Sequence, residues 1–500
     1  MKFIKKNYFK ILFITILLIA ILVRVYQWPD LLELNVDESM TALNAKAIAE
    51  TGKDLTGVSF PVYLEAWGFA GQSVMLAYIM AFFIKIFGFS LFSIRLPMIL
   101  ISLISLFIFY DFAKRIFKSK KVALVAFAFL AISPWHILQS KWSIDCNMFP
   151  HFALISIYLL YRGITDKKIF LYLSMIFFGL TMYTYGIAIY FVPFFLLISA
   201  IYLFINKKVT LKDLIICILI YFVTFTPLLI MYIINFFKIN ESINLGIFTI
   251  KYFPNSTRTD DMLLFSNNII FQLLENLKTL FNIIFKQYDY LEWNATNIFG
   301  TTYHISIIFI FIGIIYYFIK KEKNIGIKLF ILWTFLSLFV GVFINGTNIN
   351  RLNIIWYPLL FLTVYGLYLI YKKIKYKRVF MVLISFVYII LFVSYNVFFY
   401  NSYYDEINHS GCFSNGLKEG ILFVKNIDKE KYYLNFNNDG GFKIYIDTYN
   451  AVLNTDIKEI KDIKNLDKES IYIVQKENID KVDISEFKFY IYGNYYIVMN

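Results

Sequence analysis

The sequence predicts an all-α polytopic membrane domain followed by a small α/β domain. The 500 residues are 59% hydrophobic and only 16% charged, which is far more apolar than an ordinary soluble domain. About twelve apolar stretches approach membrane-spanning length, and the composition turns charged and polar after about residue 400. We therefore expect about 11–13 transmembrane helices in residues 1–400 and an α/β domain in residues 401–500.

The first apolar stretch, residues 9–27, follows a basic flank and is long enough to cross a bilayer. No small-x-small cleavage site follows it, so we expect a retained span. The bilayer core offers no partner for unpaired backbone groups, so all the apolar stretches are expected to be helices. The others lie at 71–87, 94–113, 121–138, 148–161, 168–185, 187–205, 213–234, 302–319, 326–344, 352–370 and 379–400.

The formal net charge is +14, but the lysines gather in short loops between apolar stretches, which favours a topology signal over nucleic-acid binding. Placing these loops in the cytoplasm puts the N-terminus on the cytoplasmic side of the plasma membrane. The segments 28–70, 235–301 and 401–500 then lie outside. The stretches 71–87 and 94–113 break this alternation, so one of them is expected to be re-entrant or to lie along the interface.

Cofactor motifs are scarce in the sequence. The four histidines are dispersed without an H-x-x-H or H-E-x-x-H arrangement, which argues against a zinc site. There is no P-loop, so ATP is not indicated. The three cysteines do not form a disulfide framework, and a Cys146–Cys412 pair is left open.

The first predicted outer loop carries two adjacent carboxylates, Asp37 and Glu38, in the stretch NVDESMTALNAKAIAE. Apolar residues recur there at helical spacing and Gly52 follows, which predicts an amphipathic helix near the membrane surface. Its expected apolar face consists of Val36, Met40, Leu43 and Ala47. Asp37 has two interpretations: the N-cap of a helix that begins at Glu38, or a carboxylate available for chemistry.

A further acid, Glu65, lies in PVYLEAWGFAGQS, just before the chain re-enters the membrane. An acid at an apolar boundary is costly to place without a use, and desolvation makes a carboxylate more basic. Residues 133–151, SPWHILQSKWSIDCNMFPH, are expected to face the same side. Lys141 and Asp145 are four residues apart there, which also allows a surface ion pair, and Pro150 is expected to start the next helix.

Arg351 opens a predicted span on the outer side, against the inside preference of cations. A guanidinium held there suits bidentate contact with a phosphate, although snorkelling to lipid headgroups is an alternative. Tyr183 and Tyr185 lie at the outer end of another span, where tyrosines are common in membrane proteins generally.

In their order along the chain, these motifs resemble polytopic glycosyltransferases of the GT-C superfamily. More narrowly, they resemble bacterial relatives of dolichyl-phosphate-mannose protein mannosyltransferases and of lipid A aminoarabinose transferases. The resemblance rests on DES at 37–39, Glu65, SIRLPMILISLISLFIFYDFAKRIF at 93–117 and SPWHILQSKWSIDCNMFPHFALISIYLLYRG at 133–163. Beyond residue 200 it rests mainly on TYG at 184–186 and on NRLNIIWYP.

The resemblance implies inverting transfer of a sugar from a polyisoprenyl-phosphate donor to a lipid, glycan or protein acceptor at the outer face. Asp37 matches an acid proposed as base or metal-associated carboxylate, and Glu65 a second acid near the acceptor or metal. Both would be ligands if Mg²⁺ or Mn²⁺ takes part. Lys141 stands where the family usually has arginine. Arg351 keeps the late cation, but Leu352 replaces the usual tyrosine.

The remaining site residues follow from these assignments. Tyr183 and Tyr185 would join Lys141 and Arg351 at the donor phosphate, and Glu38 and Asp145 would support the site. Two alternatives stay open. A transporter or flippase of lipid-linked sugars would place charged or broken helices near the bilayer midplane and show repeated halves. A polysaccharide polymerase or ligase would share the lipid-linked donor but transfer a whole glycan.

Overall fold

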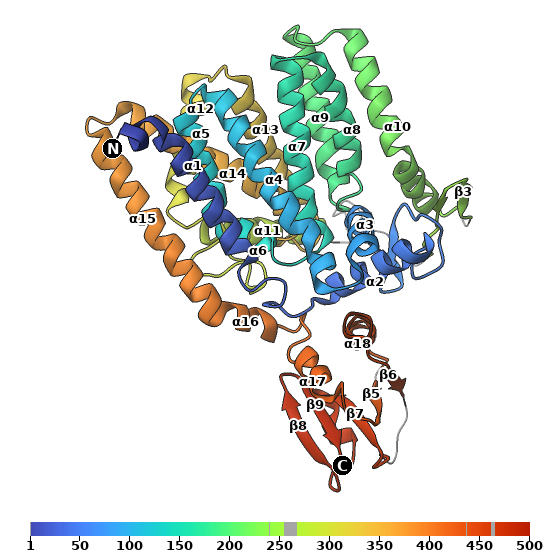
Figure 1. The fold of residues 1–500 in the computed structure, drawn as a ribbon. Coiled ribbons are helices and arrows are strands. Elements are labelled where there is room, and N and C mark those ends of the chain that lie inside the picture. Colours follow the sequence, from blue (N-terminus) through green and yellow to red (C-terminus); the bar gives the residue numbers. More distant parts are fainter. Residues whose placement is uncertain (1, 240, 255–267, 437, 462–465) are drawn as a thin grey trace.

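The computed structural model describes residues 2–239, 241–254, 268–436, 438–461 and 466–500. A bundle of helices is followed by a five-stranded sheet with its own helices (Figure 1). Among the described residues, seven helices are long and apolar enough to cross a membrane, and three further apolar helices are shorter. The mixed fold class that composition predicts is confirmed.

Each predicted apolar stretch contains a helix. These helices are α1 (Lys2–Val25), α3 (Met75–Phe87), α4 (Leu91–Phe117), α5 (Lys120–Ile132), α7 (Asp145–Thr165), α8 (Lys168–Thr181), α9 (Ala188–Ile205), α10 (Leu211–Phe236), α12 (Ser306–Lys320), α13 (Ile325–Phe343), α14 (Trp356–Lys373) and α15 (Lys377–Phe398). Shorter elements between them include α6 (Pro134–Gln139), β3 (Ile243–Leu245), β4 (Phe248–Ile250), α11 (Ile269–Phe281) and η4 (Asn353–Ile355).

The prediction that Pro150 starts a helix is wrong, because α7 begins at Asp145 and contains Pro150. A proline inside a helix cannot donate to the carbonyl four residues earlier, which here belongs to Cys146. The side-chain amide of Asn353 donates to that carbonyl instead, at 3.1 Å. A tertiary contact thus satisfies the group that proline leaves open.

The helical bundle has two ends with different contents. We call the end that carries α2 (Val36–Thr51), the 139–145 segment and the start of α4 the α2 end. The other, which carries the C-terminal ends of α4 and α7 and the predicted cytoplasmic loops, we call the basic end. There Arg115 pairs with Asp111 and with Asp166, the latter at 2.7 Å, and Lys168 pairs with Asp213 at 2.7 Å.

The predicted irregularity between 71 and 113 is located at α3. The backbone N–H of Met75, at the start of α3, donates to the carbonyl of Tyr183 at 3.0 Å. Gly88 ends helix α3, and seven residues later the guanidinium of Arg95 donates to the carboxylate of Glu38 on α2. Both flanks of α3 therefore lie at the α2 end, and α4 is the helix of the pair that runs through the bundle (Figure 1).

The first loop folds into one helix and one hairpin. Asn35 caps α2, since its side chain accepts from the backbone N–H of Asp37 at 2.9 Å, and Gly52 ends the helix in a left-handed conformation. The prediction that Asp37 is the N-cap is therefore wrong: the amide oxygen of Asn35 takes that role. The hairpin pairs β1 (Leu64–Ala66) with β2 (Phe69–Gln72) in antiparallel fashion.

The C-terminal region contains a five-stranded mixed sheet in the order β6-β5-β7-β9-β8. Strand β5 pairs in parallel with β6 and β7, whereas β9 runs antiparallel to β7 and β8. Helix α18 lies between this sheet and α2 (Figure 1). The elements are α16 (Tyr404–His409), α17 (Leu417–Val424), β5 (Glu430–Leu434), α18 (Gly440–Leu453), β6 (Ile457–Ile460), β7 (Ser470–Gln475), β8 (Lys488–Tyr492) and β9 (Tyr495–Met499).

Specific hydrogen bonds attach the C-terminal region to the segment before α2. The hydroxyl of Tyr449 on α18 donates to Oε2 of Glu33 at 2.7 Å, and the backbone N–H of Ser414 donates to the carbonyl of Leu34 at 3.0 Å. Burial raises the pKa of the Glu33 carboxyl.

Cys146 and Cys412 are free thiols, so the disulfide left open by the sequence is not formed.

Candidate active site

Asp37 is exposed in the first turn of α2, and the β1–β2 hairpin holds it at two atoms. The indole Nε1 of Trp67 donates to Oδ1 of Asp37 at 3.1 Å. The side-chain amide of Gln72 donates to the backbone carbonyl of Asp37 at 2.9 Å. Because Asn35 caps the helix, the carboxylate of Asp37 is not used for capping.

Glu38 is fully buried, although the helical pattern placed it away from the apolar face. Arg95 explains the difference: its guanidinium donates to both carboxylate oxygens of Glu38, at 2.9 and 2.6 Å. The backbone N–H of Ser143 adds a third bond at 2.7 Å. Sequence reasoning missed Arg95, and its signal was an arginine inside an apolar stretch, where a charge is costly without a partner.

Arg95 also ties down the segment before α2. Its remaining N–H groups donate to the backbone carbonyls of Pro29, Leu32 and Glu33. A buried ion pair is stable only when its remaining donors and acceptors are also satisfied, and here they are. Glu38 and Arg95 therefore fix the backbone on which Asp37 is presented.

Glu65 lies on β1, half-buried, and its carboxylate forms an ion pair with Lys251. The same ammonium donates to Oγ1 of Thr56 at 3.2 Å. Lys251 belongs to the second predicted outer loop, of which residues 255–267 lie outside the described part of the chain. Nothing in the sequence pattern singled out Lys251, because the contact joins loops that are 186 positions apart.

Lys141 and Asp145 bond different partners. Their contacts are therefore not those of the surface ion pair that their spacing allowed. Lys141 is 2% exposed, and its ammonium donates to the backbone carbonyls of Arg24 and Tyr26, each at 3.3 Å. Burial, with a smaller contribution from Arg24, lowers the pKa of Lys141 to about 7. Oδ2 of Asp145 accepts from the backbone N–H of Ser73 at 3.1 Å.

The remaining predicted site residues also lie at the α2 end. Arg351 donates to the carbonyl of Asn345 in the turn before η4. The hydroxyl of Tyr183 donates to the carbonyl of Thr224 at 3.0 Å. Tyr185 is buried, with its ring centroid 6.3 Å from that of Phe149.

Three contacts bring these segments together. Ser143 joins the Lys141 segment to Glu38, Ser73 joins the end of the hairpin to Asp145, and the amide of Asn353 donates to Asn147 Oδ1 at 3.0 Å. Asp37 therefore bonds the turn, and Asp145 the end, of the hairpin that carries Glu65. Lys141 and Arg351 are at the same end of the bundle, but both side chains point to backbone carbonyls.

Buried polar atoms without a protein partner also occur at this place. A buried side-chain atom with no hydrogen-bond partner among the described residues is found in Ser39, Gln72, Ser73 and Ser143. Other atoms of three of these residues bond Asp37, Glu38 or Asp145. Leaving such an atom unpaired costs about 1–3 kcal/mol, so the cluster needs water or a polar ligand.

Two histidines, His136 and His151, meet inside the bundle at a tyrosine that is distant in the sequence. The hydroxyl of Tyr357 lies 3.2 Å from Nε2 of His136 and 2.7 Å from Nδ1 of His151, and Arg24 lies 2.6 Å from Nδ1 of His136. Tyr357 and Arg24 occupy the ring nitrogens of His136. Across the described residues, no group of three or more His, Cys, Asp or Glu side chains could hold a metal ion.

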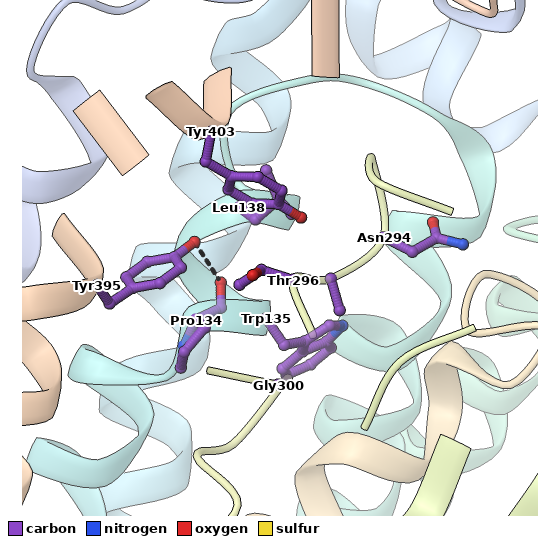
Figure 2. A pocket seen from close by; sticks show the side chains of 9 residues that line it. Pro134, Trp135, Leu138, Asn294, Thr296, Gly300, Tyr395 and Tyr403 are labelled. Atoms are coloured by element: carbon purple, nitrogen blue, oxygen red, sulfur yellow. Dashed lines mark hydrogen bonds between the residues drawn. The ribbon is translucent and has the colours of Figure 1, made fainter. Parts of the chain in front are cut away.

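Figure 2 shows a small hollow between α6, the 294–300 segment and the end of α15. Its empty space totals about 160 Å³, well below the 300–1,000 Å³ of typical ligand pockets. Tyr395 donates to the carbonyl of Pro134 at its wall, at 3.4 Å. None of the predicted site residues lines this hollow, so we assign the candidate site to the surroundings of Asp37.

Known proteins with the same fold were found among solved structures. ArnT from Cupriavidus metallidurans bound to undecaprenyl phosphate is 11% identical, with a TM-score of 0.58 and 98% of each chain covered. The archaeal oligosaccharyltransferase AglB from Archaeoglobus fulgidus, in complex with an inhibitory peptide and a dolichol-phosphate, is 12% identical, with a TM-score of 0.53. That match covers 95% of this chain and 70% of the other. No curated protein matches the sequence.

Residues 71–231 match the family model described as dolichyl-phosphate-mannose-protein mannosyltransferase. This region runs from the end of the hairpin into α10. At 10–12% identity the structural likeness establishes the fold. The chain is thus an integral multi-pass membrane protein with the fold of GT-C glycosyltransferases, as the ordered sequence motifs predict.

Proposed function

We propose that this protein is a membrane glycosyltransferase that moves a hexose or related sugar from a polyisoprenyl-phosphate carrier to an acceptor at the outer face of the plasma membrane. The observation that carries the proposal is the position of Asp37. Its carboxylate is exposed and does not cap the helix, since Asn35 does. The hairpin holds it next to buried polar atoms at one end of a GT-C fold.

In the proposed reaction, the acceptor hydroxyl attacks the anomeric carbon from the side opposite the phosphate. The bond from the anomeric carbon to the acceptor oxygen forms while the bond to the phosphate oxygen breaks, which inverts the configuration. Asp37 takes the proton of the hydroxyl as general base. The lipid phosphate leaves with the electron pair of the broken bond, so no strong general acid is required.

The cations at the α2 end would stabilise the departing phosphate. Lys141 and Arg351 are the predicted donor contacts, with Tyr183 and Tyr185 beside them. In the present conformation Lys141 and Arg351 donate to backbone carbonyls, so donor binding would have to draw these groups to the phosphate. The structural relative bound to undecaprenyl phosphate supports a lipid-phosphate ligand for this fold.

A divalent cation at Asp37 and Glu65 remains a prediction. Glu65 is paired with Lys251 and Asp37 with Trp67, and this donor set does not fit a resident cation. The proposed reaction does not pass through a metal. A chelator tests the prediction: loss of transfer with EDTA and its return with Mn²⁺ would support a cation, whereas unchanged transfer would remove it.

Product analysis tests the function. Membranes that contain the protein would be supplied with labelled polyprenyl-phosphate mannose and with labelled polyprenyl-phosphate glucose. Single labelled sugars attached covalently to an acceptor, in excess over membranes that lack the protein, support the proposal. Label that crosses the membrane still on its lipid indicates a flippase, and transfer only of preassembled glycans indicates a polymerase or ligase. Either result would contradict the proposal.

A further inference from the structure

The β1–β2 hairpin places a tryptophan where its backbone conformation is unfavourable. Trp67 and Gly68 form the two-residue turn, with φ angles of +58° and +78°. Turns of this kind favour Asn-Gly or Gly-Gly, since a large side chain crowds the backbone at positive φ. Residues held in such conformations cluster at functional sites, where the strain serves a geometric purpose.

The hairpin bonds Asp37 at two atoms. Trp67 donates to Oδ1 of the carboxylate, and Gln72 on the same hairpin fixes the backbone carbonyl of that residue. Binding Oδ1 restricts rotation of the carboxylate and leaves Oδ2 to accept a proton. A general base works only within hydrogen-bond reach of the proton that it removes, so this restriction matters for the rate.

The C-terminal region reaches the same tryptophan. Helix α18 begins at Gly440, and a β-carbon added to Gly440 would lie 3.7 Å from Cζ3 of the Trp67 indole. One added to Gly441 would lie 3.5 Å from the side chain of Val36, next to Asp37. Both distances are ordinary van der Waals separations, so the start of α18 lies directly against Trp67 and Val36.

We propose that Trp67 is a positioning residue for Asp37, and that the start of α18 holds Trp67 in place, so that the C-terminal region forms part of the active site. This inference rests on the proposed function. Trp67 is 39% exposed, so part of this residue still faces solvent. Trp67 acts through the hydrogen bond to Oδ1 and not by taking a proton itself.

The test separates the hydrogen bond from the ring. Trp67→Phe keeps an aromatic ring and removes the N–H donor, whereas Trp67→His keeps a ring N–H and tolerates positive φ better than most residues. With polyprenyl-phosphate mannose as the varied substrate, Trp67→Phe should lower kcat about tenfold at unchanged donor KM, and Trp67→His should recover part of the loss. Trp293→Phe, at a half-buried tryptophan of the 289–301 segment, is the matched control and should keep wild-type kinetics.

Gly440→Leu tests the contribution of the C-terminal region. The added side chain should displace the indole, lower kcat, and raise oxidation of Trp67 in hydroxyl-radical footprinting of the full-length protein. The footprint does not depend on activity. Unchanged oxidation of Trp67 would overturn the role assigned to α18.

The positioning role is overturned if Trp67→Phe keeps wild-type kcat, or if Trp67→His is no better than Trp67→Phe. These results are distinct from a failure of the proposed function. If wild-type protein transfers sugar and Asp37→Asn does not, a fully active Trp67→Phe removes only the positioning role. If wild-type protein transfers no sugar, both proposals fall.

Discussion

The two ends of the helical bundle use charged residues in opposite ways. At the basic end, Asp111, Arg115, Arg162 and Asp166 are partly exposed and pair with one another, several of them one helical turn apart. At the α2 end, Glu38 and Arg95 are fully buried, and Asp37 faces solvent with a tryptophan as its partner.

The two ends also differ in whether the protein itself satisfies its polar groups. The pairs among Asp111, Arg115, Arg162 and Asp166 at the basic end are partly exposed, and solvent screening makes each of them worth little. The α2 end instead combines a buried ion pair, a buried lysine and buried side-chain atoms that have no hydrogen-bond partner in the described part of the chain. Such groups are costly unless water or a ligand completes them, which is what a binding site requires.

The largest difference is expected when one member of an ion pair is removed at each end. Glu38→Gln leaves Arg95 as a buried charge without its counter-ion, which should cost about 3–5 kcal/mol and sharply lower the unfolding temperature in detergent. Asp166→Asn, at the basic end, should cost no more than about 1 kcal/mol. Equal losses, measured by intrinsic fluorescence during heating, would show that the two ends do not differ in this way.

A smaller effect is expected from the buried lysine. The folded-state pKa of Lys141 is about 7, below that of an unfolded lysine. The charged ammonium of Lys141 therefore lowers the free energy of unfolding at and below pH 7. This cost is relieved as the pH rises from 7 toward the unfolded value, by up to about 1.4 kcal/mol per pH unit.

Lys141→Met should remove this pH dependence. The variant should be at least as stable as wild type at pH 7, and its advantage should shrink by pH 9. Lys114→Met, at a lysine 41% exposed at the basic end, should leave the pH dependence unchanged. Parallel unfolding temperatures for wild type and Lys141→Met across pH 7–9 would contradict the assignment.

The smallest effect concerns an exposed pair at the α2 end. Lys418 pairs with Asp30, whose side chain is 63% exposed. Asp30→Asn should change stability by less than about 1 kcal/mol, as at the basic end. A large loss would mean that position at the α2 end, and not burial, sets the cost of removing a charge.

The sequence predicted the helices better than their contacts. Apolar length alone located a helix in each predicted stretch, because a bilayer leaves the backbone no alternative to helix. It could not show that α3 stays at one end, since residues 71–87 and 94–113 are both apolar. It also misplaced the start of α7 at Pro150, because the side chain that satisfies the Cys146 carbonyl comes from a distant turn.

The candidate site shows the same limit. The acids Asp37 and Glu65 stood out as charges beside apolar runs, which is a local property. Their partners, Trp67 and Lys251, did not, because a tryptophan near a membrane and a lysine in a loop are common in such chains. Asn35 was overlooked as a cap in favour of Asp37, although both residue types suit that role equally well.

The comparison between the ends leads to one decisive measurement, the rate of sugar transfer from purified polyprenyl-phosphate mannose by two aspartate variants in parallel. If the α2 end is the active site, Asp37→Asn loses at least about 100-fold in kcat, as removal of a general base does. Asp166→Asn then stays within about twofold of wild type, since its pair is an exposed one. Transfer by Asp37→Asn at the wild-type rate, or equal losses in both variants, would contradict the assignment of the active site to the α2 end.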